Sequence, residues 1–146
     1  MKKARDVLGA MVAGTDGVLA AELIGMDGSP IEVLKLEAEF PAESISQDVV
    51  TAVKLFLYMS RKVEGGSLDH IMMTCERFTV LVAVPGLDHC VALFLTTKGN
   101  LGKARVQFRR YLPDLVGAVD AAGGCCDDCR EWGTDHRDRP MGLYRD

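Results

Sequence analysis

Residues 100–105 of the chain read Asn100-Leu101-Gly102-Lys103-Ala104-Arg105, and they are the residue types of a helix start. The side-chain oxygen of Asn100 can accept a hydrogen bond from the first helical turn. Leu101 can anchor that turn in a core, and Gly102 permits a close approach of the helix to a sheet. Beyond this stretch, apolar residues recur on one side at helical spacing: Leu101, Ala104, Phe108, Leu112 (or Tyr111), Leu115 and Val119. The pattern predicts a helix from Leu101 to Leu112, with a kink or a break near Leu112 because Pro113 lies inside it.

The composition indicates one domain with an appendage. The chain has 146 residues, of which 48% are hydrophobic and only 6% aromatic, so we expect an aliphatic core. Its net charge is −4 and no Lys/Arg cluster stands free of carboxylates, which argues against a nucleic-acid partner. No run of about 18 apolar residues occurs, so we expect no membrane insertion. Because Asp6 follows the basic start at once, a secretory leader does not fit, and a cytoplasmic location is expected.

Hydrophobic patterning predicts the element order helix, two strands, helix, three strands, helix. Helical spacing of apolar residues indicates helices at 3–13 and about 46–61 besides the one described above, with Ser44 or Ser46 as the cap of the middle helix. Strand-like runs bounded by turn residues lie at five places: 18–25, 31–36, 68–74, 78–84 and 90–96. Short connectors then predict one five-stranded, mainly antiparallel sheet sandwiched by helices, an α/β (α+β) domain over residues 3–120.

The middle helix has a wider apolar arc than one sheet can cover. The arc has a central stripe and two flanks: Val49, Val53, Phe56 and Ser60 in the stripe, Ala52 and Met59 on one flank, Val50 and Leu57 on the other. With Leu55 it spans roughly 220°, about twice the ~100° needed to pack one helix on one sheet. We therefore expect something besides the sheet to cover part of this helix.

Three stretches at the joints of this element order carry a family resemblance. Gly17–Gly28 is a strand that starts at a glycine and runs into an Asp-Gly turn, and Gly65–Leu68 is a glycine turn after the middle helix. Asn100–Arg105 has the form N-L-G-x-x-R at the start of the last helix. Together they resemble the roadblock family, which includes dynein light chain roadblock and the bacterial MglB-type proteins. The resemblance covers about residues 3–120.

The resemblance implies the profilin-like roadblock fold and a homodimer in which two sheets join edge to edge and the middle helices lie side by side. In that dimer the central stripe would face the sheet, and Ala52 and Met59 would form the dimer interface. Burying a few Leu, Met and Val side chains at ~1.5–3 kcal/mol each is enough to hold a dimer. Pairing would also remove an unpaired strand edge.

MglB-type proteins bind a small Ras-like GTPase and raise its GTP hydrolysis by reshaping its switch regions, without inserting an arginine. The resemblance therefore implies a homodimeric regulator that stimulates hydrolysis by such a GTPase. From the helical phase of the middle helix we predict four partner-binding residues: Thr51, Leu55, Tyr58 and Lys62. The alternative is a roadblock dimer that joins other proteins as an assembly scaffold without changing a nucleotide cycle.

No catalytic centre is predicted, so we expect the chain not to be an enzyme and to need no cofactor. It has no Walker-type phosphate loop and no G-x-S-x-G elbow. Cys75 or Cys90 with His70 or His89 would be a nucleophilic pair, but His89 and Cys90 are strand neighbours that point to opposite faces. Arginines can stabilise the transition state of GTP hydrolysis. Surface charge is nevertheless the preferred interpretation of four of them: Arg61, Arg77, Arg109 and Arg110.

Apolar content falls from Gly123 onward, so residues 123–146 are predicted to be a polar, cysteine-containing tail. Four of its side chains are candidate zinc ligands: Cys125, Cys126, Cys129 and His136. Because only one C-x-x-C pair occurs, the preferred interpretation is a mobile tail without metal. A redox pair of Cys126 and Cys129 is the other alternative. Trp132 is a candidate for docking on a hydrophobic groove of the same subunit or of a partner.

Overall fold

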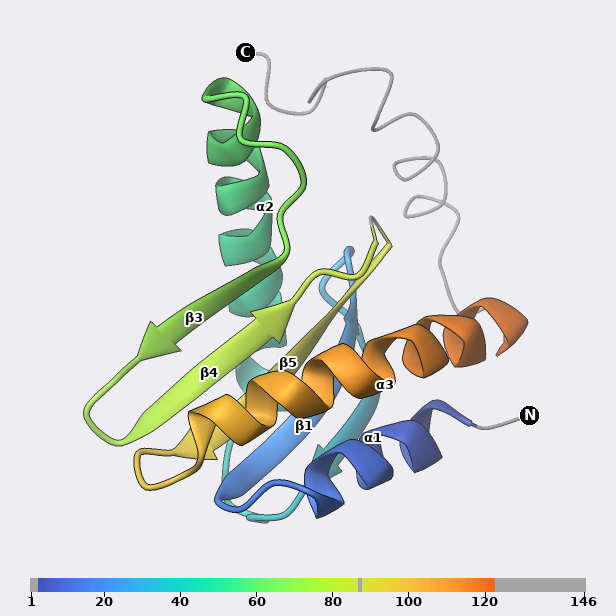
Figure 1. Ribbon diagram of the computed structural model, residues 1–146, viewed down its shortest axis with the longest axis vertical. Helices are drawn as coiled ribbons and strands as arrows, with labels where there is room; N and C mark the ends of the chain where they lie inside the picture. The colour runs from blue at the N-terminus through green and yellow to red at the C-terminus, as the bar shows by residue number, and fades with distance from the viewer. Residues whose placement is uncertain (1–2, 87, 123–146) are drawn as a thin grey trace.

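The computed structural model describes residues 3–86 and 88–122, which form the predicted succession of helices and strands (Figure 1). The elements are α1 (Ala4–Ala13), β1 (Val18–Gly25), β2 (Pro30–Lys35), the 3-10 turn η1 (Glu43–Ile45), α2 (Ser46–Lys62), β3 (His70–Thr74), β4 (Phe78–Ala83), β5 (His89–Thr96) and α3 (Leu101–Ala122). The predicted element order is therefore confirmed. The predicted tail at 123–146 lies outside the described residues.

The strands form one five-stranded sheet in the order β2-β1-β5-β4-β3. Every neighbouring pair is antiparallel, which confirms the predicted sheet. Three of the pairs are consecutive along the chain and fold as hairpins, whereas the pairing of β1 with β5 places Ala21 opposite Leu93 and joins the two halves. β5 therefore lies at the centre of the sheet, and β2 and β3 form its edges.

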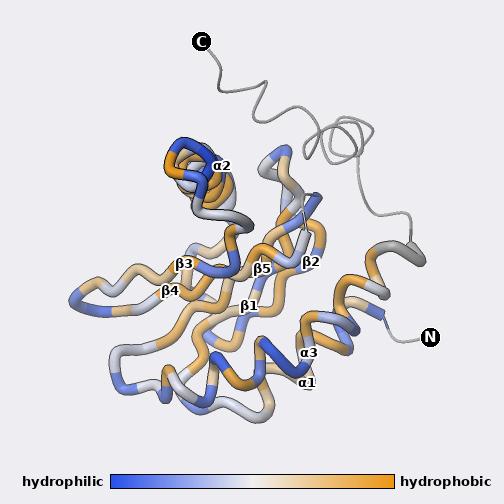
Figure 2. The backbone as a smooth tube through the Cα atoms, turned by 45° about the horizontal axis from the view of Figure 1, so that its top comes forward, coloured by the Kyte–Doolittle hydropathy of each residue, from blue (hydrophilic) through white to orange (hydrophobic). Residues whose placement is uncertain are grey.

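Helices cover both faces of this sheet. α1 and α3 pack side by side on one face, and α2 lies on the other (Figure 1), an arrangement that Figure 2 shows from a second direction. Successive side chains of β5 point to opposite faces of the sheet. Val91, Leu93 and Leu95 belong to the core under α1 and α3, while Ala92 and Phe94 belong to the core under α2.

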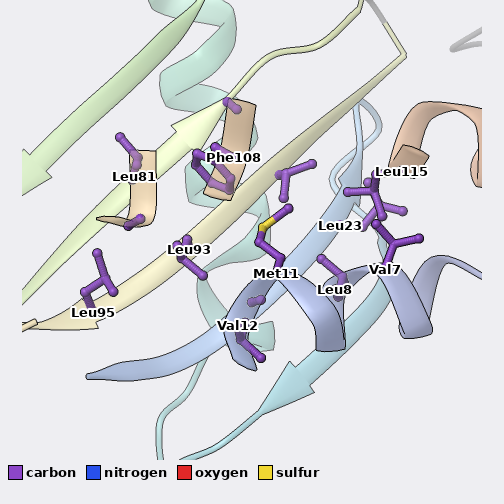
Figure 3. Close-up of a cluster of buried hydrophobic side chains, with 14 of the residues drawn as sticks. Val7, Leu8, Met11, Val12, Leu23, Leu81, Leu93, Leu95, Phe108 and Leu115 are labelled. Atoms are coloured by element: carbon purple, nitrogen blue, oxygen red, sulfur yellow. The ribbon is translucent and has the colours of Figure 1, made fainter. Parts of the chain in front are cut away.

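The core under α1 and α3 confirms the prediction of aliphatic packing. Side chains from both helices meet three strands there (Figure 3): Val7, Leu8, Met11 and Val12 of α1, Leu23 of β1, Leu81 of β4, Leu93 and Leu95 of β5, and Phe108 and Leu115 of α3. All of them are buried. Burying a side chain of this size stabilises a fold by ~1.5–3 kcal/mol.

α3 runs without interruption from Leu101 to Ala122, so of the kink or break predicted near Leu112, the break is wrong. Pro113 lacks the N–H that would bond the Arg109 carbonyl, and an interior proline costs a helix ~3 kcal/mol. The helix continues because Leu115 and Val119, beyond the proline, are buried against the core. The burial of these side chains thus outweighs the cost of a proline inside the helix.

The start of α3 confirms one sequence-based expectation and corrects another. Asn100 caps the helix, because its Oδ1 accepts a hydrogen bond of 3.0 Å from the backbone N–H of Lys103. Gly102, by contrast, is exposed and does not mediate a close approach to the sheet. The close approach occurs nearby, where a Cβ on Gly17 would lie 2.8 Å from the Cα of Gly99. Gly17 also has a φ of +80°, which favours glycine.

The start of α2 differs from the predicted serine cap. The residue at the cap position is Ile45, with no side-chain cap hydrogen bond, and η1 leads directly into the helix. Ser44 donates its hydroxyl hydrogen bond to the Pro41 carbonyl at 2.8 Å instead. Ser46 is buried and bonds to the carboxylate of Glu22 in the sheet. Neither serine therefore caps the helix.

Candidate protein-interaction surface

α2 presents a row of apolar side chains to solvent. The row consists of residues three or four positions apart, which share one side of a helix: Leu55 (54% exposed), Phe56 (39%), Met59 (48%) and, just past the helix end, Val63 (77%). We call these four residues the α2 apolar row. Large exposed apolar side chains gathered in one place mark interaction surfaces more often than scattered ones do.

The rotation of α2 on the sheet differs from the predicted one. We expected the stripe from Val49 to Ser60 to face the sheet, with Phe56 buried. Instead Val50 and Leu57, predicted to form a flank, are buried together with Val53. These three residues lie on the same side of the helix as Ser46, whose bond to Glu22 anchors the first turn to β1. Phe56 is therefore turned outward into the α2 apolar row.

The two residues predicted to form a dimer interface lie at this row. Met59 is a member of it, and Ala52, one turn before Phe56, is half-buried beside it. The sequence prediction missed Phe56 because it assigned that residue to the sheet side. It missed Val63 because the helix was expected to end at about Arg61, whereas α2 continues to Lys62.

Of the four predicted partner-binding residues, three lie on the outward side of α2, and Tyr58 packs in part against the core beneath the helix. Thr51 and Lys62 are exposed, Leu55 belongs to the apolar row, and Tyr58 is half-buried. Lys62 holds its ammonium nitrogen 5.2 Å from the centre of the Tyr58 ring, a cation–π distance. The hydroxyl of Thr51 donates to the Gln47 carbonyl one turn back at 2.9 Å. The structure thus places all four beside one another along the helix.

The two edges of the sheet differ in chemistry. On β2, Glu32 pairs with Arg5 of α1 at 2.8 Å, and Lys35 pairs with Glu43 of η1 at 3.1 Å. On β3, Met72 and Met73 are 44% and 50% exposed, and within the described residues β3 pairs with β4 alone. Charges at a strand edge discourage pairing with another chain, whereas an apolar edge permits it. β3 is therefore the edge suited to an intermolecular sheet.

A buried polar pair fixes the helix that carries the row. Glu22, in the middle of β1, is fully buried and accepts a hydrogen bond at Oε2 from the hydroxyl of Ser46. Its Oε1 has no hydrogen-bond partner among the described residues. Burial raises the pKa of Glu22, the bond from Ser46 lowers it, and the charge of Glu43 raises it. A carboxyl group in this position ties the start of α2 to the sheet.

Comparison with solved structures identifies this architecture. A structure described as MglB with tetrameric arrangement superposes with a TM-score of 0.74 at 17% identity, over 82% of this chain and 89% of that one. The chain has the roadblock/LC7 fold. The gliding protein MglB of Thermus thermophilus gives 0.73 at 18% identity, over 81% of this chain and 89% of that one. A roadblock/LC7 domain of Streptomyces avermitilis gives 0.69 at 15% identity, over 83% and 98%.

At these identities the likeness to roadblock proteins is one of fold. No family model matches the sequence, and no curated protein matches it either. The three stretches that carry the resemblance nevertheless lie at the joints of the roadblock fold. Gly17 directly precedes β1, Gly66 lies in the turn between α2 and β3 with a φ of +83°, and Asn100 caps α3. The resemblance to roadblock proteins is thus confirmed in its fold.

The cysteines and histidines considered for catalysis lie at the ends of β3 and at the start of β5. Burial raises the pKa of the Cys90 thiol to about 12, and the charge of Glu22 adds to the effect, so Cys90 stays protonated and is a poor nucleophile. His70 begins β3 and Cys75 follows its end, which separates them by the strand's length of ~16 Å. His89 is buried next to Cys90 in β5. Of the four arginines, Arg61 is half-buried and the other three are exposed.

His70 takes part in a surface chain of polar contacts. Its Nε2 lies 3.1 Å from Nη2 of Arg105, and its Nδ1 lies 2.8 Å from Oδ2 of Asp69. Because a guanidinium only donates, Nε2 accepts and the proton resides on Nδ1, where it bonds to the carboxylate. The contacts join the start of β3 to α3 across the face opposite α2.

The predicted metal ligands lie outside the described residues, as does Trp132. Within residues 3–86 and 88–122, no group of three or more His, Cys, Asp or Glu side chains could hold a metal ion. None of the helices in this part of the chain is long and apolar enough to cross a membrane.

Proposed function

We propose that the chain forms a homodimer that binds a small Ras-like GTPase and stimulates its GTP hydrolysis. The observation that carries the proposal is the α2 apolar row, an exposed apolar surface on the helix that the roadblock fold leaves uncovered. The motif resemblance to MglB-type regulators is the reason for proposing a Ras-like GTPase as the partner.

Two independent features support the dimer. The β3 edge offers a five-residue strand with exposed Met72 and Met73, which can pair with the same strand of a second copy. Because α2 covers the same face of both sheets, a two-fold axis beside β3 brings the two α2 helices alongside each other. Each apolar side chain that becomes buried there contributes up to ~1.5–3 kcal/mol. The association also removes part of the α2 apolar row from contact with water.

The polar side of α2 supports a second contact, with the GTPase. Thr51, Tyr58 and Lys62 lie around the helix from the apolar row and present a hydroxyl, a ring and an ammonium group. Two such helices side by side form a platform that can hold the switch regions of a GTPase in the hydrolytic arrangement. Pre-organising the nucleotide site in this way raises the rate without a catalytic group from the regulator.

The proposal is tested with the purified chain and a Ras-like GTPase from the same organism. We expect a complex on gel filtration and faster phosphate release from the GTP-bound GTPase. Lys62→Glu should weaken both, whereas Lys98→Glu, a matched charge reversal in the exposed turn before α3, should leave both unchanged. A complex without a change in rate would favour the scaffold alternative. Neither complex nor rate change would contradict the proposal.

A further inference from the structure

A groove of about 1120 Å³ runs between α3 and the β3–β4 end of the sheet, on the face opposite α2. Its floor is apolar, with Leu81 and Ala83 of β4 and Phe108 of α3 among its lining residues. Val106 of α3, which is 62% exposed, lies at its rim. The proposed GTPase surface uses neither α3 nor this face of the sheet.

Three arginines of α3 form one wall of the groove: Arg105, Arg109 and Arg110. Arg105 is engaged with His70, which is itself bonded to Asp69. Arg109 and Arg110 form no ion pair with any carboxylate of the described residues. Two cations without a counter-charge beside an apolar floor fit a peptide that carries carboxylates and a large apolar side chain.

The chain's own sequence supplies such a peptide directly after α3. Residues 127–132 read Asp127-Asp128-Cys129-Arg130-Glu131-Trp132, and they follow two consecutive glycines at 123 and 124. Glycine adopts the left-handed conformation at which helices commonly end, so it allows the chain to reverse direction there. Arg109 lies ~20 Å back along the helix from Ala122 at 1.5 Å per residue. The ten residues from 123 to 132 can span up to ~33–36 Å, which is ample.

We propose that residues 127–132 of the same chain occupy the α3 groove. Trp132 covers the apolar floor, where an aromatic side chain can bury ~150–250 Å². The carboxylates of Asp127, Asp128 and Glu131 face Arg109 and Arg110. This assignment is independent of the α2 proposal.

The single tryptophan makes the proposal measurable, because Trp132 is the one tryptophan of the chain. We would record its emission maximum and its quenching by acrylamide in the full chain, in Arg109→Glu/Arg110→Glu and in the control Arg77→Glu/Lys98→Glu. The control reverses two exposed charges that do not line the groove. Circular dichroism establishes that each variant folds, and Asp127→Lys/Asp128→Lys tests the same contact from the other side.

We expect blue-shifted emission and slow quenching in the full chain. Reversal at 109 and 110, or at 127 and 128, should shift the emission to that of free N-acetyltryptophanamide and raise the quenching constant severalfold. The control should behave like the unmodified chain. In 1 M salt, where the screening length falls to ~3 Å, the emission should shift part of the way.

Three results would overturn the proposal. Emission of the full chain equal to that of free N-acetyltryptophanamide would mean that the segment is not docked. A blue shift that survives both charge reversals would place Trp132 elsewhere. A blue shift lost on dilution would assign the groove to the tail of a second copy.

Discussion

Ser46, the first residue of α2, donates its hydroxyl hydrogen bond to the buried carboxylate of Glu22 in β1, 24 positions earlier in the chain. The bond links the outer helix to the sheet at the point where the helix begins. It places the side of α2 that contains Val50, Val53 and Leu57 against the sheet. Phe56 and Met59 lie on the side of α2 away from the sheet, so they face solvent and form the candidate interface.

Ser46→Ala should lower the free energy of unfolding by ~1–3 kcal/mol, because it leaves the buried Glu22 carboxylate without its donor. Urea denaturation at neutral pH measures the change. Ser44→Ala is the matched control, since the Ser44 hydroxyl is exposed and bonds to the Pro41 carbonyl. Equal effects of the two substitutions would mean that the Glu22–Ser46 bond does not stabilise the fold.

The raised pKa of Glu22 predicts a specific pH dependence. A carboxyl group that binds its proton more tightly in the folded chain makes stability fall as pH rises from the unfolded value, near 4.5, through the folded one. Glu22→Gln has no proton to lose there. The free energy of unfolding of this variant, relative to the unmodified chain, should therefore increase with pH across this range. Denaturation curves at several pH values measure it, and a difference that stays constant would refute the assignment.

Pro113 interrupts the hydrogen bonding of α3 while the helix continues through it. Pro113→Ala restores the missing N–H at an exposed position, so the free energy of unfolding should rise by ~1–3 kcal/mol. Asp114→Ala, at the next exposed position, is a control for a general gain in helix propensity. If Pro113→Ala left the stability unchanged or reduced it, the helix would not be strained at this residue.

The chemistry of the sheet edges predicts where the dimer forms. Met73→Lys places a charge on the β3 edge and should shift the molecular mass in sedimentation equilibrium from dimer to monomer. Leu36→Lys changes a side chain of similar exposure just beyond β2 and should leave the dimer intact. A dimer that survives Met73→Lys, or that dissociates only with Leu36→Lys, would move the interface away from β3.

Local sequence patterns predicted the fold well where turn residues mark the ends of an element. The bounds of β1 were predicted to the residue, because Gly17 precedes it and an Asp-Gly turn follows. β3 starts two residues later than predicted, because its pairing with β4 begins at His70 opposite Ala83. The continuity of α3 through Pro113 depends on packing that no local pattern contains.

The candidate surface was predictable in its helix but not in its side chains. An apolar arc of roughly 220° indicates that a helix has more than one partner, but not which part faces the sheet. The side of α2 that faces the sheet depends on the bond between Glu22 and Ser46, which are far apart in sequence and meet only in the folded chain. The sequence alone therefore does not assign Phe56 and Val63 to the candidate interface. The groove beside Arg109 depends likewise on how α3 lies on β4.

The most direct test of the central claim is the single-turnover rate of GTP hydrolysis by a Ras-like GTPase from the same organism, measured over a range of concentrations of the chain. We predict that the rate rises with the fraction of dimer determined by sedimentation in parallel. Met59→Glu, which charges the α2 apolar row, should abolish both the dimer and the acceleration. A hydrolysis rate that does not change at concentrations where the chain is dimeric would contradict the account.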